Sequence, residues 1–239
     1  MRLIISFLLY GLRTSLSRED LQNRLTGFAN ADILQENRAR ITRRDMLTMK
    51  AENISGIVLA GGFSRRMGTD KAELTLGGLT LLEIQVRKLR QIGITDIMIS
   101  GYRKPMEGTR AIEDIYPHMG PMSGIHACLK AAKTEACLVV SVDVPLFPAE
   151  WLEKLIRAHD GPVTMLCHGD EMEPLLAVYD TALASMAEEL ILSGNRSVRS
   201  LFTGSKVNRL EYTGDPDFLL NCNTPEDFEK AKMLYRRVN

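Results

Sequence analysis

The sequence predicts an α/β domain with a Rossmann-like, three-layer architecture built on a mostly parallel sheet. From Ile54 onward, short apolar segments alternate with longer segments whose apolar residues recur at helical spacing. Such alternation is typical of a parallel sheet that is covered by helices on both faces. Residues 136–142 read Ala-Cys-Leu-Val-Val-Ser-Val, as expected of a strand buried on both faces. Ligands of such folds bind beyond the carboxyl ends of the strands, so the residues after each strand are the functional candidates.

The elements of this domain can be justified in chain order. Leu81, Ile84 and Leu89 share one face of a predicted helix over 81–92, which Gly93 ends. Thr224 caps the last helix, with Pro225 in its first position. The other predicted helices are 123–132, 150–159 and 182–192, and the predicted strands are 54–60, 97–100, 110–113, 136–142, 163–167 and 175–179.

The composition excludes several classes of protein. Hydrophobic residues make up 45% and charged residues 25% of the chain, which excludes collagen-like and wholly disordered proteins. Lys and Arg total 30, as do Asp and Glu, so no net charge attracts nucleic acid or a membrane. The four cysteines form no CxxC pair and the four histidines no HExxH motif. We therefore expect reduced thiols, no zinc site and a cytoplasmic location, without nucleic-acid or membrane partners.

Residues 1–52 differ from the rest and are predicted to be an N-terminal extension to a domain spanning 53–239. The apolar segment Leu3–Tyr10 is shorter than the roughly 20 residues that span a bilayer. No small-residue cleavage site follows it. Met46 and Met49 lie just before the first strand, so we expect a disordered tail or a misassigned start. A docking helix and a targeting segment are the alternatives.

A glycine-rich, basic loop follows the first strand. It reads Leu-Ala-Gly-Gly-Phe-Ser-Arg-Arg-Met-Gly-Thr-Asp-Lys from Leu59 to Lys71. Glycines let backbone N–H groups approach a ligand, and the cations supply positive charge at the same place. The spacing is neither that of a P-loop nor GxGxxG. The loop therefore predicts a polyphosphate site, with a solvated surface turn as the alternative.

Carboxylates and amides follow three further predicted strands. Asp114 follows a short strand, and Asp143 ends the most apolar one. A buried carboxylate such as Asp143 needs a cation, which is either Mg²⁺ bridging it to phosphates or a Lys or Arg partner. Asn221 and Asn223 flank a predicted strand end and are suited to ligand binding or to loop and cap contacts.

In combination these motifs resemble those of the molybdenum cofactor guanylyltransferases. The similarity covers residues 54–235 and includes Gly-Pro-x-x-Gly at 120–124 and Glu-Pro-Leu at 173–175. It implies a glycosyltransferase-A-like fold of the nucleotide-diphospho-sugar transferase type. It also implies transfer of GMP from GTP to the phosphate of molybdopterin, with Mg²⁺ as cofactor and pyrophosphate as the product. Molybdoenzymes or cofactor-insertion proteins would be the protein partners.

The resemblance also assigns roles to individual residues. Catalysis falls to Lys71, Asp143 and Arg66, and the Mg²⁺ ligand is Asp143. From their own chemistry rather than from the resemblance, Asn221 and Asn223 are candidate molybdopterin or loop contacts, and Arg196 and Arg199 are further molybdopterin candidates. Ser100 stands where the family often has Asn, and Met122 where it has Leu. The GTP-binding residues are Leu59, Ala60, Gly61, Gly62, Lys71, Ser100, Asp114 and Asp143.

The chemistry agrees with this assignment, and two other functions compete with it. A phosphate monoester has its second pKa near 6, so the acceptor is mostly dianionic at pH 7 and needs no general base. The obstacle is the electrostatic repulsion between two anions, which a metal and cations overcome.

Transfer from CTP, or to a sugar or alditol phosphate, is the competing reaction, although Gly61-Gly62 and Asp70-Lys71 favour GTP by resemblance. A non-catalytic nucleotide-binding module is the competing function of another class.

Overall fold

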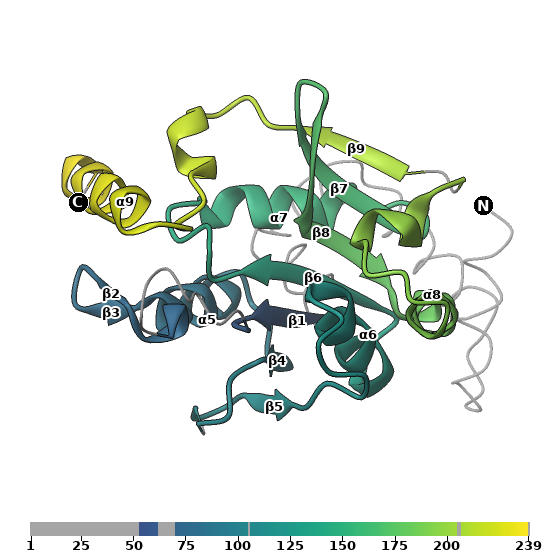
Figure 1. The fold of residues 1–239 in the computed structure, drawn as a ribbon. Helices are drawn as coiled ribbons and strands as arrows, with labels where there is room; N and C mark the ends of the chain where they lie inside the picture. Colours follow the sequence, from purple (N-terminus) through teal and green to yellow (C-terminus); the bar gives the residue numbers. More distant parts are fainter. Residues whose placement is uncertain (1–52, 62–69, 105, 205–206, 239) are drawn as a thin grey trace, which may run out of the picture. The chain divides into compact units, whose positions relative to one another are not determined.

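A seven-stranded sheet with the order β5-β4-β1-β6-β8-β7-β9 organises the part of the chain that the computed structural model describes, residues 53–61, 70–104, 106–204 and 207–238. Figure 1 shows the strands stacked from β5 at the bottom to β9 at the top. Within this sheet only β8 is antiparallel to its neighbours, which confirms the predicted mostly parallel α/β fold. The strands are β1 (Ile54–Leu59), β4 (Ile97–Ser100), β5 (Arg110–Ile112), β6 (Ala136–Ser141), β7 (Val163–His168), β8 (Glu171–Asp180) and β9 (Val207–Glu211).

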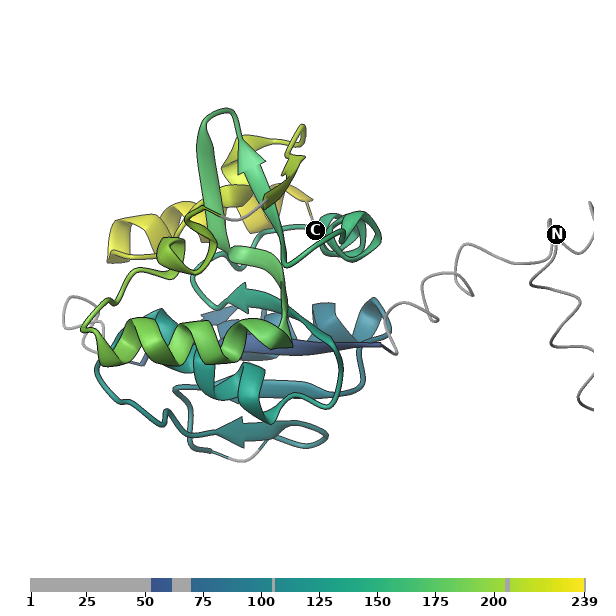
Figure 2. The ribbon, with the colours of Figure 1, turned by 90° about the vertical axis from the view of Figure 1, so that its right-hand side faces the viewer.

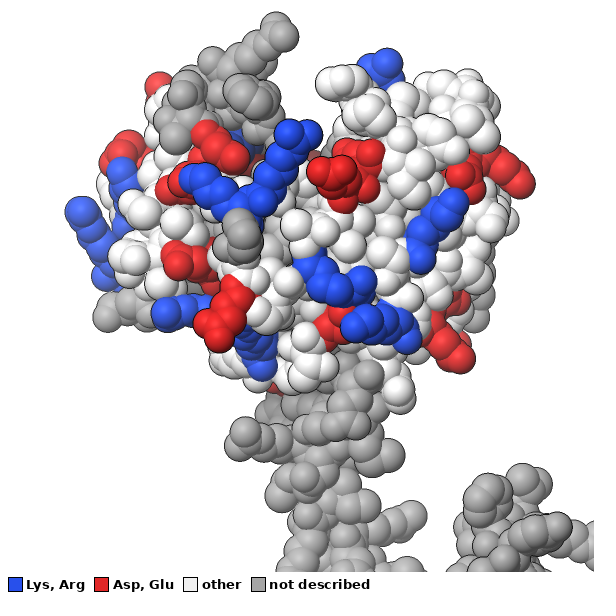
Figure 3. Space-filling model, turned by 90° about the horizontal axis from the view of Figure 1, so that it is seen from below, with Lys and Arg blue, Asp and Glu red and all other residues white. Residues whose placement is uncertain are grey.

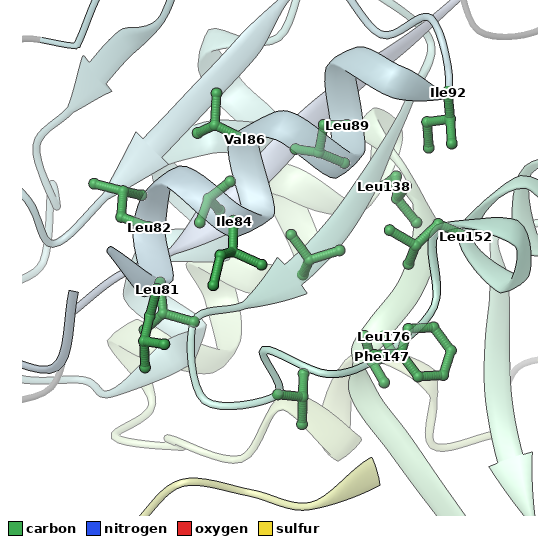
Figure 4. Packing of buried hydrophobic residues seen from close by; sticks show 14 of the residues in the cluster. Leu81, Leu82, Ile84, Val86, Leu89, Ile92, Leu138, Phe147, Leu152 and Leu176 are labelled. Atoms are coloured by element: carbon green, nitrogen blue, oxygen red, sulfur yellow. The ribbon is translucent and has the colours of Figure 1, made fainter. Parts of the chain in front are cut away.

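Helices cover both faces of the sheet. One buried cluster joins the sheet to α5 (Leu81–Gln91), α7 (Ala149–Ala158) and α9 (Pro225–Val238), and Figure 4 shows part of its packing. A second cluster joins the opposite face to α6 (Pro121–Ala131) and α8 (Ala184–Leu192), which lie side by side in Figures 1 and 2. Along β6, Leu138 and Val140 belong to the first cluster, and Cys137 and Val139 to the second. This alternation along a fully buried strand produces the three layers.

Local signals explain where the helices begin. Thr80 caps α5 in a capping box, accepting a hydrogen bond from Glu83 N at 3.1 Å while Glu83 Oε2 accepts one from Thr80 N at 2.7 Å. Hydrogen bonds from Thr80 also lower the pKa of the Glu83 carboxyl. Helix α6 begins at Pro121, two residues before the predicted start, because proline suits the first helical position.

Several elements were not predicted. These are the strand β9, which pairs in parallel with β7, and the hairpin of β2 (Thr75–Leu76) and β3 (Leu79–Thr80). Strand β8 is longer than the predicted 175–179, because its first residues continue the pairing with β7 as far as Glu171 and His168. A bulge interrupts this pairing, where Met165 pairs with Ala177 and Leu166 pairs with Glu173. Four 3₁₀ segments complete the described elements, η1 (Lys71–Glu73), η2 (Thr181–Leu183), η3 (Val198–Phe202) and η4 (Pro216–Leu219).

The surface carries charges of both signs. Figure 3 shows basic and acidic side chains interspersed over the face seen from below. No helix of the described segments is long and apolar enough to cross a membrane. The predicted extension, residues 1–52, lies outside the described residues, so its state stays a prediction.

Candidate active site

The carboxyl ends of three adjacent parallel strands meet at one edge of the sheet. Leu59, the last residue of β1, lies opposite Ser100 on β4 and Ser141 on β6. The pairing continues past the strands, because Ala60 N donates to Ser100 O at 2.9 Å and Val142 N donates to Leu59 O at 3.1 Å. The residues that follow these strands therefore converge at this edge, as predicted for a ligand site.

A buried cation contacts Asp143 at this edge. Lys71 Nζ donates to Asp143 Oδ1 at 2.9 Å and to Asn223 Oδ1 at 2.8 Å. The side chain of Lys71 is 10% exposed and that of Asp143 is 29% exposed, so the pair is shielded but open on one side. The sequence predicted either Mg²⁺ or a Lys or Arg side chain as the partner of Asp143. In the structure, the Lys71 side chain forms an ion pair with it.

The backbone of Asp143 is fixed on both sides. Its N–H donates to Ser141 Oγ at 3.2 Å, and its carbonyl accepts from Cys222 N at 2.8 Å. Cys222 is fully buried here, and burial raises the pKa of its thiol to about 12. A neutral, buried thiol serves packing rather than chemistry.

Asn223 is held by the start of α9. Asp227 Oδ2 accepts hydrogen bonds from Asn223 N at 3.1 Å and from Thr224 N at 2.9 Å. Thr224 Oγ1 in turn accepts from Asp227 N at 3.2 Å, as the sequence predicts for a capped helix. These hydrogen bonds lower the pKa of the Asp227 carboxyl, and the bond from the Thr224 backbone has the largest effect. The cap thus positions the amide that contacts Lys71.

The loops after β1 and β4 are in direct backbone contact. Gly101 has a φ of +81°, and a Cβ on it would lie 2.2 Å from the Cα of Gly61. Real side chains do not tolerate such an approach, so glycine is required at position 101. Beside this contact, Ser100 Oγ donates to Asp114 Oδ1 at 3.0 Å. The predicted nucleotide-binding residues after β1, β4 and β5 therefore lie next to one another.

A second connection between these loops was not predicted. Tyr102 Oη donates to Glu73 Oε1 at 2.9 Å, and Lys104 Nζ contacts the same oxygen at 2.5 Å. The hydrogen bonds from Lys104 and Tyr102 lower the pKa of the Glu73 carboxyl. Glu73 lies in η1 together with Lys71, so this contact ties the Lys71 turn to the loop after β4. The sequence did not predict this contact, because isolated polar residues in loops form no motif.

Some predicted site residues lie elsewhere. The side chain of Asn221 is directed to Leu219 O at 3.5 Å and does not take part in the Lys71 cluster. Arg196 and Arg199 are exposed around η3, and no hydrogen bond or ion pair among the described residues joins them to that cluster. Gly62 and Arg66 lie outside the described residues.

The donor chemistry at Asp143 is compatible with Mg²⁺. This ion is commonly held by one or two carboxylates together with substrate phosphates and water, rather than by an all-protein cage. Asp143 supplies a partly exposed carboxylate at the ligand-binding edge of the sheet. In the described parts of the chain, His, Cys, Asp and Glu form no group of three or more suited to a metal. Asp143 is therefore a residue that could hold such an ion together with substrate phosphates.

Comparisons with known proteins converge on one family. Residues 56–210 match the family described as MobA-like NTP transferase domain. A probable molybdenum cofactor guanylyltransferase of Opitutus terrae is 33% identical over 198 residues, covering 78% of this chain and 98% of that protein. A molybdenum cofactor guanylyltransferase of Xanthomonas euvesicatoria is 35% identical over 180 residues, covering 74% of this chain and 93% of that protein.

Solved structures agree on the fold. The crystal structure of molybdopterin-guanine dinucleotide biosynthesis protein A from Archaeoglobus fulgidus matches with a TM-score of 0.65 and 26% identity, over 77% of this chain and all (100%) of that one. A 4-diphosphocytidyl-2C-methyl-D-erythritol synthase from Anaerococcus prevotii matches with a TM-score of 0.62 over 80% of this chain and 99% of that one. At 17% identity, the second match supports the fold alone. The glycosyltransferase-A-like architecture expected from the sequence is confirmed.

Proposed function

The chain belongs to the family of MobA-like NTP transferase domains, and from this premise we propose that it is a molybdenum cofactor guanylyltransferase. It is a nucleotidyltransferase that transfers GMP from GTP to the phosphate of molybdopterin and releases pyrophosphate. The observation that carries this proposal is the contact of Lys71 with Asp143 at the carboxyl edge of the sheet. It joins a cation suited to phosphates and a carboxylate suited to a metal beside the loop that begins at Leu59.

The residues at this edge divide the work of binding the nucleotide. The backbone around Ala60 and Gly61 is proposed to approach the base and ribose. It lies against Gly101, where an added Cβ would be 2.2 Å from the Cα of Gly61. Ser100 holds one oxygen of Asp114, which leaves the other oxygen for the nucleotide. Gly62 and Arg66 are proposed to complete the phosphate side, as the sequence motif indicates.

Lys71 and Asp143 are proposed to serve the transfer step. The attacking phosphate of molybdopterin is already dianionic at neutral pH, so no side chain has to remove a proton. Lys71 places a compact positive charge against the phosphates, where negative charge develops on the leaving pyrophosphate. Asp143 would hold Mg²⁺, which when bound neutralises phosphate charge. Asn223 contacts Lys71, so its role is to orient the ammonium group rather than to bind substrate alone.

Residues 53–239 are proposed to carry the whole reaction, and residues 1–52 to be dispensable for it.

The protein partners are proposed on chemical grounds. The product is a large, anionic dinucleotide that has to reach an apoenzyme, so molybdoenzymes or cofactor-insertion proteins are the proposed recipients. We also propose a cytoplasmic location.

One experiment separates GTP transfer from its alternatives. Protein is incubated with molybdopterin, Mg²⁺ and each nucleoside triphosphate in turn, and the dinucleotide product is identified by mass. A guanine dinucleotide formed from GTP, with a much higher kcat/KM than for CTP, is the expected result. Equal use of CTP and GTP would favour a less selective nucleotidyltransferase. Binding of GTP without any product would favour a non-catalytic nucleotide-binding module.

A further inference from the structure

A glutamine is buried in the apolar face of α5. Gln85 is 2% exposed and lies among the buried residues Leu82, Val86 and Leu89 of the same helix. A buried polar side chain costs free energy unless its hydrogen bonds are satisfied. Gln85 Nε2 donates to Ser141 O at 2.8 Å and to Val144 O at 3.1 Å. Because both partners are carbonyl oxygens, only the nitrogen side of the amide can face them.

These two carbonyls flank Asp143. Ser141 lies two residues before it and Val144 directly after it. One turn further along α5, Lys88 Nζ donates to the next carbonyl, Pro145 O, at 2.6 Å. Helix α5 therefore holds three carbonyls of the loop 141–145 through two side chains. Cys222 N holds the carbonyl of Asp143 itself at 2.8 Å.

The same helix also carries the turn that contains Lys71. Leu81 N, at the start of α5, donates to Leu74 O at 2.8 Å, directly after η1. Ala72 of η1 is buried in the same apolar cluster as Leu81. Helix α5 thus supports both the cation and the carboxylate, and the Gln85 side chain is one of the links that fix their separation.

We propose that Gln85 is a positioning residue, whose two hydrogen bonds place the Asp143 carboxylate for the metal–nucleotide complex. This inference rests on the proposed function and deepens it. The hydrogen bonds of Gln85 go to backbone carbonyls and not to Lys71 or to the carboxylate, so we propose that it acts through the backbone of the loop 141–145. Residues that orient a metal ligand typically affect metal affinity or activity by about 10- to 100-fold.

The test replaces Gln85 by Met, which has a similar length and no donor. The matched control is Leu89→Met, a buried substitution on the same helix at a side chain that packs over Gly56 of β1. Binding of Mn²⁺ in the presence of GTP is followed by electron paramagnetic resonance, together with kcat, KM and Tm. For Gln85→Met we expect Mn²⁺ affinity and kcat to fall by about 10-fold or more. For Leu89→Met both are expected to stay within twofold of wild type, with a similar change in Tm.

The outcomes separate this inference from the proposed function. If Gln85→Met retains wild-type Mn²⁺ affinity and kcat, the positioning role is overturned. If both variants weaken Mn²⁺ binding equally, the effect is a general consequence of core substitution and the role is again overturned. If the wild-type protein itself binds no Mn²⁺ with GTP, the proposed function fails instead. Should Gln85→Met not fold, Gln85→Asn is used, because its shorter amide cannot reach both carbonyls.

Discussion

Lys71 Nζ lies 2.9 Å from Oδ1 of Asp143, although the two residues are 72 positions apart in the sequence. The carboxylate at the end of the most buried strand is therefore neutralised by the protein's own cation. A metal ion that approaches Asp143 has to share or displace this contact. In the proposed function, Lys71 and the metal would therefore compete for Asp143 until the phosphates of the nucleotide offer the ammonium group a new partner.

Lys71→Ala is expected to have two opposite effects. Without nucleotide, Mn²⁺ should bind more tightly, because the competing ammonium is gone. With GTP and molybdopterin, kcat/KM should fall by about 30- to 1,000-fold, since a charge-assisted contact to the transition state is worth about 2–4 kcal/mol. Lys71→Arg should restore only part of the activity, because a planar guanidinium does not replace a compact ammonium.

The control for this variant is Lys230→Ala on the surface of α9. Lys230 pairs with Asp217 at 2.9 Å, and we assign it no part in the site. Both its Mn²⁺ affinity and its steady-state kinetics should equal those of wild type. A Lys71→Ala protein with kcat/KM within twofold of wild type would contradict the proposed role.

Asp143→Asn should separate catalysis from nucleotide binding. The amide keeps the shape of the side chain but is a poor ligand for a hard cation, so turnover should fall by at least about 100-fold. The Kd for GTP without metal should not rise, because the amide removes a negative charge that repels the phosphates. Isothermal titration gives the Kd, and product formation at saturating Mg²⁺ gives the rate. Wild-type turnover under those conditions would rule out Asp143 as the metal ligand.

Gly101→Ala should reduce both stability and GTP affinity. Its φ of +81° is strained for alanine, and the new Cβ would lie 2.2 Å from the backbone of Gly61. Gly204→Ala is a matched control, since Gly204 has the same φ of +81° and a Cβ added there would have nothing within 4 Å. Strain of about 1–3 kcal/mol corresponds to roughly 2–12 °C in Tm. Gly101→Ala should lose more than Gly204→Ala in thermal melts and alone should raise the KM for GTP.

A chain that starts at Met49 should fold and retain full activity. Every strand of the described sheet begins at Ile54 or later, and the described site uses no earlier residue. The measurements are the far-UV circular dichroism spectrum, Tm and kcat/KM of this chain beside those of the full chain. Insolubility or loss of activity would mean that residues 1–48 contribute to the domain.

The four thiols should be unreactive in the folded protein. All four cysteines are buried, and burial raises the pKa of both Cys128 and Cys222 to about 12. At pH 8 a disulfide reagent should therefore label none of them before urea is added and all of them afterwards. The unfolded thiols ionise near pH 8.5, well below the folded ones, so the free energy of unfolding should fall as pH rises from about 8.5 towards 12. A thiol labelled at once in buffer would contradict this burial.

The sequence predicted those helices and strands that have a clear hydrophobic periodicity or a helix-capping residue. The strand 97–100 was predicted with its correct ends, and the predicted helix 81–92 differs from α5 by one residue. Strand β9 was missed because Val207–Glu211 is short, partly exposed and held by pairing with β7 rather than by an apolar pattern. The β8 bulge was missed because it is a property of the pairing between two strands.

The sequence named Lys71 and Asp143 as candidates but did not identify them as partners, and their roles in binding and catalysis stay a prediction. Lys71 and Asp143 each follow a buried strand, which made each a candidate. Their mutual contact depends on where α5 holds both segments, and sequence spacing carries no such information. Gln85 did leave a signal, an amide among the apolar positions of a helix, although its partners could be known only from the structure.

The Lys71–Asn223 contact has a consequence for the order in which the site is completed during synthesis. It joins residues 152 positions apart, and Asn223 follows all the described strands in chain order. On the ribosome, the sheet and the nucleotide loop can therefore emerge before the segment that orients Lys71. The contact that orients Lys71 is therefore among the last parts of this site to be synthesised.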